Sequence, residues 1–172
     1  MQSHKIKVLD ASAIIHGYNP SVEEGDHYTT PEVLEEVESK KILVDQALSF
    51  GKLKISTPDP KYIQKVKDIV NKTGDNLSNQ DIGILALALQ LNAPLYTDDY
   101  GIQNVAKKLG VEIRGISFKP TNKNFLWRKV CVGCKKIYPI NCEDEVCEIC
   151  GSPLKRKMVK LRLSKKNSSK KF

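Results

Sequence analysis

The chain has 172 residues, which suits one domain of ordinary size and a small additional module. It is 40% hydrophobic and 28% charged, and no apolar run approaches the roughly 18 residues of a membrane span. We therefore expect a soluble cytoplasmic protein with no signal peptide and no membrane contact. The net charge of +8 is uneven, because residues 121–172 carry 14 Lys and Arg against 4 Asp and Glu. A basic end favours a nucleic-acid partner, with a merely solubilising tail as the alternative.

Strand-like segments and helical patterns alternate through residues 1–116. Proline follows a capping residue at Thr30-Pro31 and at Asp59-Pro60, and Gly51, Gly74 and Gly110 each close a helical pattern. In chain order we predict a strand at 5–9, a helical turn at 11–16, a loop at 18–26, helices at 31–40 and 41–50, a strand at 53–55, helices at 60–73 and 78–91, a strand at 93–96, a helix at 102–109 and a strand at 111–113. This alternation predicts the α/β class, with a parallel sheet flanked by helices.

The helix that starts near Ser78 has the clearest N-terminal signal. Ser78 and Asp81 have the spacing of a capping box. Apolar residues recur on one face behind them and predict a buried stripe: Ile82, Leu85, Ala86 and Leu89. Asp81 lies in the first turn, where the helix dipole favours a negative charge. It is therefore either a capping acid alone or one wall of an acidic metal pocket.

Further carboxylates follow other predicted elements. Asp10 ends the first strand, Glu36 lies on the helix after Thr30-Pro31, and Asp98 and Asp99 follow a later strand. In α/β sheets, ligands bind beyond the carboxyl ends of the strands, so these side chains can meet there. Carboxylates that meet repel one another unless divalent cations bridge them, and oxygen ligands suit Mg²⁺ or Mn²⁺. Such ions can activate water and stabilise the attacking and leaving oxygens of a phosphodiester.

Two CxxC pairs dominate the basic end of the chain. Cys131 and Cys134 form the first pair, and Cys147 and Cys150 form the second, with twelve residues between the pairs. This spacing predicts a closed, structural Zn²⁺ site with four thiolate ligands. Disulfides are the competing interpretation, but they require an oxidising compartment, and no secretion signal is present. Cys142, between the pairs, is expected to be a bystander.

The cysteines define a second, smaller domain. We place a linker at 117–124, a zinc ribbon at 125–163 with strands at 125–130, 137–140 and 155–163, and a disordered basic tail at 164–172. Basic and apolar residues alternate in the last strand, which predicts one face in solvent. Trp127 beside basic residues suits RNA stacking, and filling of the small ribbon core is an equally open alternative.

Four motifs, in this order, resemble those of the PIN-domain nucleases: Asp10-Ala11-Ser12-Ala13, Thr30-Pro31-x-Val33-x-x-Glu36-Val37, Asp81-Ile82-x-x-Leu85-Ala86 and Leu95-Tyr96-Thr97-Asp98-Asp99. With the four-cysteine ribbon behind them, they are similar to one branch of that family, the small-subunit rRNA-processing endonucleases of archaea and eukaryotes. Residues 72–75 (KTGD), 97–100 (TDDY) and 103–106 (QNVA) are similar to this branch as well. The resemblance covers about residues 5–163 and implies a PIN-like fold for residues 1–116.

The resemblance also implies roles for single residues. It assigns metal-binding carboxylates to Asp10, Glu36, Asp81 and one of Asp98 or Asp99. Glu36 matches the family spacing because it precedes Val37, whereas Glu35 does not. The Thr-x-Asp pattern and the alternation of an extended segment both favour Asp99, and Asp98 can share the site. Ser12 and Thr97 either hydrogen-bond the carboxylates or metal-bound water, or they only cap the backbone at the strand ends.

We therefore expect a Mg²⁺- or Mn²⁺-dependent single-strand endoribonuclease that processes the 3′ end of precursor small-subunit rRNA. The expected partners are that rRNA and the pre-ribosomal particle, and the expected oligomeric state is a monomer or weak dimer. One alternative is a toxin-type PIN ribonuclease that acts on another RNA, although the ribbon argues against it. A second is a non-catalytic rRNA-binding assembly factor. A ribosomal or transcription-type zinc ribbon would leave the acidic residues unexplained.

Overall fold

The computed structural model describes residues 5–117 and 125–160. The chain divides into two compact units, Met1–Asn122 and Lys123–Phe172. Most of the predicted linker at 117–124 and all of the predicted tail at 164–172 lie outside the described residues. The first unit contains β1 (Ile6–Leu9), α1 (Ala11–Ile15), β2 (Asp26–Thr29), α2 (Pro31–Glu36), the 3₁₀ helix η1 (Glu38–Lys40), α3 (Lys41–Ser49), β3 (Leu53–Ile55), α4 (Pro60–Thr73), α5 (Asn79–Leu91), β4 (Leu95–Tyr96), α6 (Tyr100–Leu109) and β5 (Ile113–Arg114).

The first unit is built on a five-stranded sheet in the order β3-β2-β1-β4-β5, and every neighbouring pair is parallel. The predicted α/β class, with a parallel sheet flanked by helices, is confirmed. The predicted loop is wrong at its end, because Asp26 begins β2. The inward side chains of β2 are polar, which hid the strand from hydrophobic patterning. His27 and Thr29 are buried, and both hydrogen-bond to carbonyl oxygens, of Lys52 and Leu9 respectively.

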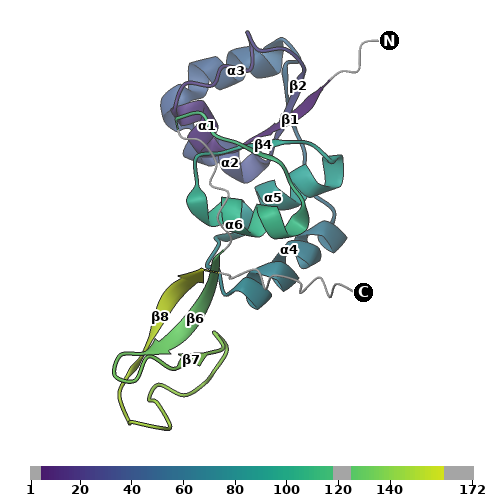
Figure 1. The fold of residues 1–172 in the computed structure, drawn as a ribbon. Helices are drawn as coiled ribbons and strands as arrows, with labels where there is room; N and C mark the ends of the chain where they lie inside the picture. Colours follow the sequence, from purple (N-terminus) through teal and green to yellow (C-terminus); the bar gives the residue numbers. More distant parts are fainter. Residues whose placement is uncertain (1–4, 118–124, 161–172) are drawn as a thin grey trace, which may run out of the picture. The chain divides into compact units, whose positions relative to one another are not determined.

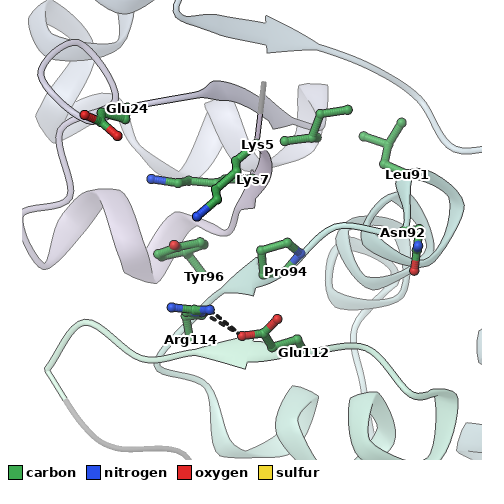
Figure 2. A pocket seen from close by; sticks show the side chains of 10 residues that line it. Lys5, Lys7, Glu24, Leu91, Asn92, Pro94, Tyr96, Glu112 and Arg114 are labelled. Carbon is green, nitrogen blue, oxygen red and sulfur yellow. Dashed lines mark hydrogen bonds and ion pairs between the residues drawn. The ribbon is translucent and has the colours of Figure 1, made fainter. Parts of the chain in front are cut away.

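Helices cover the two faces of the sheet unequally. Figure 1 shows α4, α5 and α6 on one side and α1 and α3 on the other. The register pairs Leu9 with Tyr96 and Tyr96 with Arg114, so these side chains share one face. Leu9 is buried, whereas Tyr96 is half-buried and Arg114 is exposed. This part of the sheet lines an open pocket (Figure 2).

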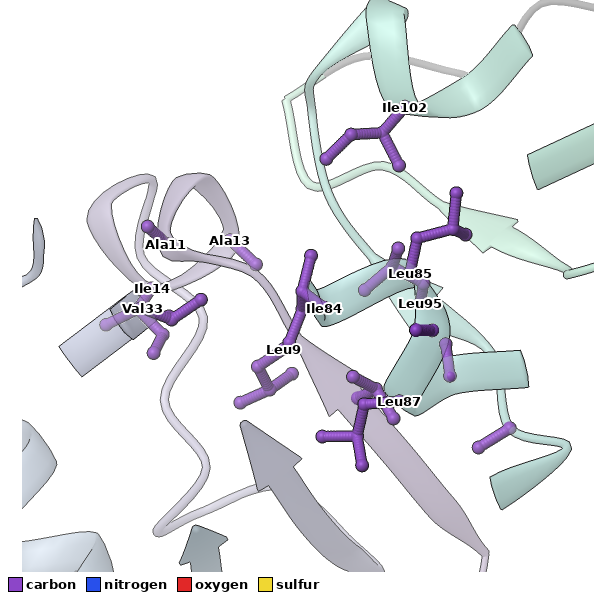
Figure 3. Packing of buried hydrophobic residues seen from close by; sticks show 14 of the residues in the cluster. Leu9, Ala11, Ala13, Ile14, Val33, Ile84, Leu85, Leu87, Leu95 and Ile102 are labelled. Atoms are coloured by element: carbon purple, nitrogen blue, oxygen red, sulfur yellow. The ribbon is translucent and has the colours of Figure 1, made fainter. Parts of the chain in front are cut away.

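Helix α5 is the centre of the core rather than a helix with a single buried stripe. Its fully buried residues run round the helix and include Ile84 and Leu87 as well as Leu85. A helix that is apolar on all sides is buried on all sides, and α5 packs against β1, α4 and α6. Figure 3 shows Ile84, Leu85 and Leu87 in one apolar cluster with Leu9 and Leu95 of the central strands. This packing fixes the N-terminus of α5, and Asp81 with it, against the sheet.

Most predicted helix ends agree with the structure. Helices α4 and α6 end at Gly74 and Gly110, both of which have positive φ angles. Helix α2 is shorter than predicted, since it stops at Glu36 and a turn of 3₁₀ helix follows. The Thr30 side chain makes no capping hydrogen bond, so the start of α2 relies on Pro31 at its first position.

The second unit is a small antiparallel sheet in the order β7-β6-β8, formed by β6 (Phe125–Cys131), β7 (Ile137–Tyr138) and β8 (Leu154–Lys160). The predicted continuation of β8 to residue 163 lies outside the described residues. Residues 155–158 of β8 are all exposed, so the prediction of a single solvent face is wrong for this strand. The buried cluster contains Cys131, Tyr138 and Cys147. A core this small needs a further source of stability.

No helix in the described part of the chain combines the length and the apolar character needed to cross a bilayer.

Candidate active site and cysteine cluster

Asp10 lies where β1 ends and is held by two hydroxyl groups. Ser12 and Thr97 both donate to its Oδ2, over 2.9 and 2.8 Å. The two hydroxyl oxygens are also 3.2 Å apart, so they form one network. Of the two interpretations of Ser12 and Thr97, the structure therefore shows the carboxylate contact. Both of these bonds go to the same oxygen of Asp10.

Asp10, Glu36 and Asp81 form an acidic cluster at the carboxyl edge of the sheet. Burial raises the pKa of Asp10, and the charge of Asp81 adds to this, while the hydroxyls of Thr97 and Ser12 oppose it. Glu36 is largely exposed, yet partial desolvation and then the charges of Asp10 and Asp81 raise its pKa as well. The three carboxylates therefore repel one another. A divalent cation would relieve that repulsion.

Asp81 completes the predicted capping box. Its backbone N–H donates to Ser78 Oγ over 3.1 Å, and its Oδ2 accepts from the Ser78 N–H and hydroxyl over 2.9 and 2.7 Å. As at Asp10, two donors hold one oxygen of the carboxylate. The capping and pocket interpretations of Asp81 are therefore compatible.

The adjacent residues Asp98 and Asp99 point in different directions. Asp98 is buried, and its carboxylate accepts from the N–H groups of Ile116 and Ser117 and lies 2.6 Å from Nδ1 of His16. Burial alone would raise the pKa of Asp98, but these donors outweigh it and lower that pKa. Asp99 is exposed and caps α6, with Oδ1 accepting from the Gly101 N–H over 2.7 Å. Its own N–H donates to Thr97 Oγ1, which links Asp99 to the Asp10 network.

Sequence reasoning overlooked one contact close to this edge. Asn104 on α6 donates to Asp75 Oδ2 over 2.7 Å and so ties the segment before α5 to α6. Both residues belong to stretches that carried the family resemblance, the KTGD and QNVA motifs. Their separation of 29 residues leaves no local signal for the pairing. The bond thus links the segment that leads to Asp81 with the helix that follows Asp99.

The acidic cluster fits a hydrated divalent ion. Its donors are carboxylate oxygens, two of which are fixed by hydrogen bonds, and Mg²⁺ usually keeps several waters beside one or two carboxylates. Among the described residues, the acidic side chains do not approach one another as closely as the four cysteine sulfurs do.

The cysteine cluster is much tighter. The sulfurs of Cys131, Cys134, Cys147 and Cys150 all lie within 4.8 Å of one another. Two of the separations are 3.3 and 3.5 Å. Four sulfurs bound to one Zn²⁺ at about 2.3 Å would be about 3.8 Å apart, so the set fits a tetrahedral ion. Cys142 lies outside this group and its sulfur is 3.6 Å from Asp144 Oδ2.

Neighbouring donors favour the thiolate form of two of the four cysteines, Cys147 and Cys150. The Ser152 hydroxyl and backbone lower the pKa of Cys150 to about 5. The Tyr138 hydroxyl lies 3.1 Å from the Cys147 sulfur and lowers the pKa of that thiol. Cysteine binds metal as the thiolate, so both contacts prepare the site for a cation. These features are consistent with a zinc ribbon.

Positive charges face each other across the β6–β8 pair. Arg128 lies opposite Lys157, and Lys129 opposite Arg156. Like charges directly opposite each other destabilise a strand pair. The Arg156 guanidinium lies 4.2 Å from the Trp127 ring centroid. Trp127 lies outside the buried ribbon cluster, so it does not fill that core.

Comparison with known proteins agrees with this geometry. Residues 7–91 match the family described as the PIN domain of ribonuclease. The fold and the acidic edge thus define a PIN-domain nuclease with a C-terminal ribbon. The chain is 74% identical to Endoribonuclease Nob1 of Methanocaldococcus jannaschii over 166 residues, covering 96% of this chain and 84% of that protein.

Two further relatives are more distant. Endoribonuclease Nob1 of Methanothermobacter thermautotrophicus is 41% identical, covering 88% of this chain and 92% of that protein. Ribonuclease VapC1 of Thermoplasma acidophilum is 39% identical, covering 88% of this chain and 77% of that protein. The chain belongs to the Endoribonuclease Nob1 family and is an endoribonuclease.

Proposed function

We propose that this endoribonuclease depends on Mg²⁺ or Mn²⁺ and processes the 3′ end of precursor small-subunit rRNA within the pre-ribosomal particle. The acidic cluster of Asp10, Glu36 and Asp81 carries the catalytic part of the proposal. The substrate part is supported by the resemblance to the rRNA-processing branch and by the match to Endoribonuclease Nob1 proteins. Action in the cytoplasm and a monomer or weak dimer belong to the same proposal.

In this proposal Asp10, Glu36 and Asp81 hold the divalent ion, and Asp99 completes the set through its link to Thr97. The bound ion would supply an activated nucleophile and charge stabilisation at the phosphodiester. Ser12 and Thr97 orient Asp10, and Ser78 orients Asp81, so the carboxylate directions are set before the ion arrives. Ordering of this kind avoids reorganisation during the reaction.

The ribbon serves as an rRNA-docking module in the same proposal. Zn²⁺ on the four cysteines would hold the knuckles together, and the basic strand pair β6–β8 would face RNA phosphates. The basic tail predicted at 164–172 would add further phosphate contacts. The opposed positive pairs support this role, because phosphates between or beside them would offset their repulsion.

Cleavage of a single-stranded RNA that spans the 3′ end of precursor small-subunit rRNA tests the proposed function. We expect Mn²⁺- or Mg²⁺-dependent cutting at one position, and little cutting of a shuffled RNA of equal length and composition. Asp10→Asn keeps the side-chain shape and should lower the rate by more than about 100-fold, beyond the usual cost of losing an outer-sphere partner.

Three outcomes would contradict the proposal. Equal rates for the wild type and Asp10→Asn would remove Asp10 from the site. Equal cutting of the shuffled RNA would favour a ribonuclease that acts on other RNAs. Binding of the rRNA fragment without cutting, under either ion, would favour the non-catalytic assembly factor.

Neighbouring substitutions separate the roles of Asp98 and Asp99. Asp98→Asn should lower the free energy of unfolding by about 2 kcal/mol or more, because a charged acceptor of buried N–H groups is lost. Its effect on the cleavage rate should be small. Asp99→Asn should keep the α6 cap, since asparagine caps as well as aspartate, but should lower cleavage at least about 10-fold. Denaturant unfolding and single-turnover cleavage measure the two effects, and the reverse pattern would move the ligand role to Asp98.

A further inference from the structure

A polar pocket opens on the face of the sheet that α1 and α3 leave uncovered at β4. It has a volume of about 570 Å³, within the usual range for sites that hold a small ligand. Its charged and aromatic lining consists of Lys5, Lys7, Glu24, Tyr96, Glu112 and Arg114 (Figure 2). We call it the β4 pocket. None of the carboxylates proposed to bind the divalent ion lines it.

The ammonium group of Lys7 is held in place by an ordered set of contacts. It donates to the Tyr18 hydroxyl over 3.2 Å, and the Tyr18 oxygen is 2.9 Å from Nε2 of the buried His27. Burial lowers the pKa of His27, so the ring is neutral, and its Nδ1–H donates to the Lys52 carbonyl over 3.1 Å. Tyr18 therefore donates to His27 and accepts from Lys7. This order leaves two N–H groups of the Lys7 ammonium for a ligand.

Two aromatic rings neighbour the Lys7 ammonium in this pocket. Lys7 Nζ lies 5.7 Å from the Tyr96 ring centroid and 5.9 Å from that of Tyr18. Among the described residues, neither Lys5 nor Lys7 forms an ion pair. Glu112 is occupied by Arg114, over 2.6 Å. The Lys7 ammonium thus offers positive charge beside the half-buried Tyr96 ring, and Lys5 adds a second positive charge to the pocket lining.

We propose that the β4 pocket binds one nucleotide of a single-stranded RNA, with a phosphate at Lys5 and Lys7 and the base stacked on Tyr96. A nucleotide presents an anion for the lysines, a planar ring for the tyrosine, and N–H and O–H donors for Glu24 at the rim. An acidic peptide offers the anion without the planar base. The choice of RNA as the ligand rests on the proposed function.

The position of the pocket connects it to the acidic edge. Tyr96 directly precedes Thr97, which donates to Asp10, and the Asp10 N–H donates to the Tyr96 carbonyl over 3.1 Å. Lys7 is three residues before Asp10 on the same strand, a separation of about 10 Å at the usual rise per residue. In this proposal one RNA strand extends from the pocket to the acidic edge. The pocket would hold the strand at a distance from the phosphodiester that is cut.

A charge-matched pair of double variants tests the phosphate contact. Both are made in the full chain carrying Asp10→Asn, and the probe is fluorescein-labelled decauridylate without added divalent ion. Lys5→Gln with Lys7→Met should weaken binding about 10-fold at 50 mM salt and lower the salt slope by about 0.7, the value for one single-strand phosphate. Lys61→Gln with Lys65→Gln is the control, because those lysines also flank a tyrosine ring, Tyr62, but on helix α4. It should change the affinity less than 2-fold.

Substitutions of Tyr96 test the stacking contact. Tyr96→Phe keeps the ring and should bind decauridylate as before, whereas Tyr96→Leu should weaken binding at least about 5-fold, the lower end for one base–aromatic stack. The exposed single variant Lys5→Gln guards against misfolding of the double variant and should weaken binding about 3-fold. Equal losses in the pocket and control pairs, or no loss in the pocket pair, would overturn the proposal. Equal affinities of Tyr96→Phe and Tyr96→Leu for decauridylate would overturn it as well.

The two proposals can fail separately. Pocket-dependent binding of decauridylate without cleavage of the rRNA fragment would keep the pocket and overturn the proposed function. Cleavage of the rRNA fragment together with decauridylate binding that is indifferent to the pocket variants would do the opposite.

Discussion

Replacing Asp81 by asparagine is expected to lower cleavage by more than about 100-fold while leaving helix α5 intact. Asparagine keeps an oxygen that can accept from the Ser78 N–H and hydroxyl, so the capping contacts can remain. What disappears is the negative charge that the acidic cluster presents to a divalent ion. The free energy of unfolding should therefore change little. Single-turnover cleavage and denaturant unfolding, measured on the same preparation, separate the two effects.

A matched substitution makes the Asp81 result specific. Asp45→Asn removes one negative charge from an exposed position on α3 and should cleave at the wild-type rate. Titration of Mn²⁺ by calorimetry gives a second readout, because Asp81→Asn should weaken ion binding and Asp45→Asn should not. Wild-type cleavage and wild-type ion affinity in Asp81→Asn would reduce Asp81 to a helix cap.

Loss of the ribbon metal is expected to unfold the second unit and to leave the first unit folded. Structural Zn²⁺ contributes about 10–16 kcal/mol of apparent binding free energy in zinc-finger peptides, more than a buried cluster of this size can replace. Trp127 is the single tryptophan of the chain and stacks with Arg156, so its fluorescence reports on the ribbon alone. A strong chelator or Cys147→Ser should shift that emission to longer wavelength. The helical circular dichroism of the first unit should persist.

Cys142→Ser is the control for this experiment, because Cys142 lies outside the four-sulfur group. It should retain one zinc per chain by elemental analysis and the emission of the wild type. An unchanged Trp127 spectrum after chelation would show that the ribbon does not need its metal. Equal losses of zinc in Cys142→Ser and Cys147→Ser would contradict the assignment of the four ligands.

Features that depend on nearby residues could be predicted from the sequence. The capping box at Ser78, the glycine ends of α4 and α6, and the two CxxC knuckles each lie within a few residues, and the structure contains all of them. The parallel sheet followed from the alternation of strands and helices. The family resemblance was needed to choose Glu36 over Glu35, because both lie exposed on one short helix.

Features that depend on distant partners could not be predicted in this way. Strand β2 has a polar sequence and exists because β1 and β3 pair with it on either side. Asp98 is drawn away from the acidic cluster by His16, 82 residues earlier, and by the backbone of Ile116 and Ser117. The alternation of an extended segment predicts that the Asp98 and Asp99 side chains point in different directions, as they do. It does not indicate what Asp98 binds.

The hydrogen bonds that fix Asp10 and Asp81 also bear on how durable the domain is. Each carboxylate is tied through one oxygen, so neither can swing away from the other when no cation lies between them. Without a cation the enzyme therefore keeps like charges close together, which lowers the stability of its folded state. The cost in stability that comes with an active site is confined here to a few side chains, and the rest of the core can be selected for stability.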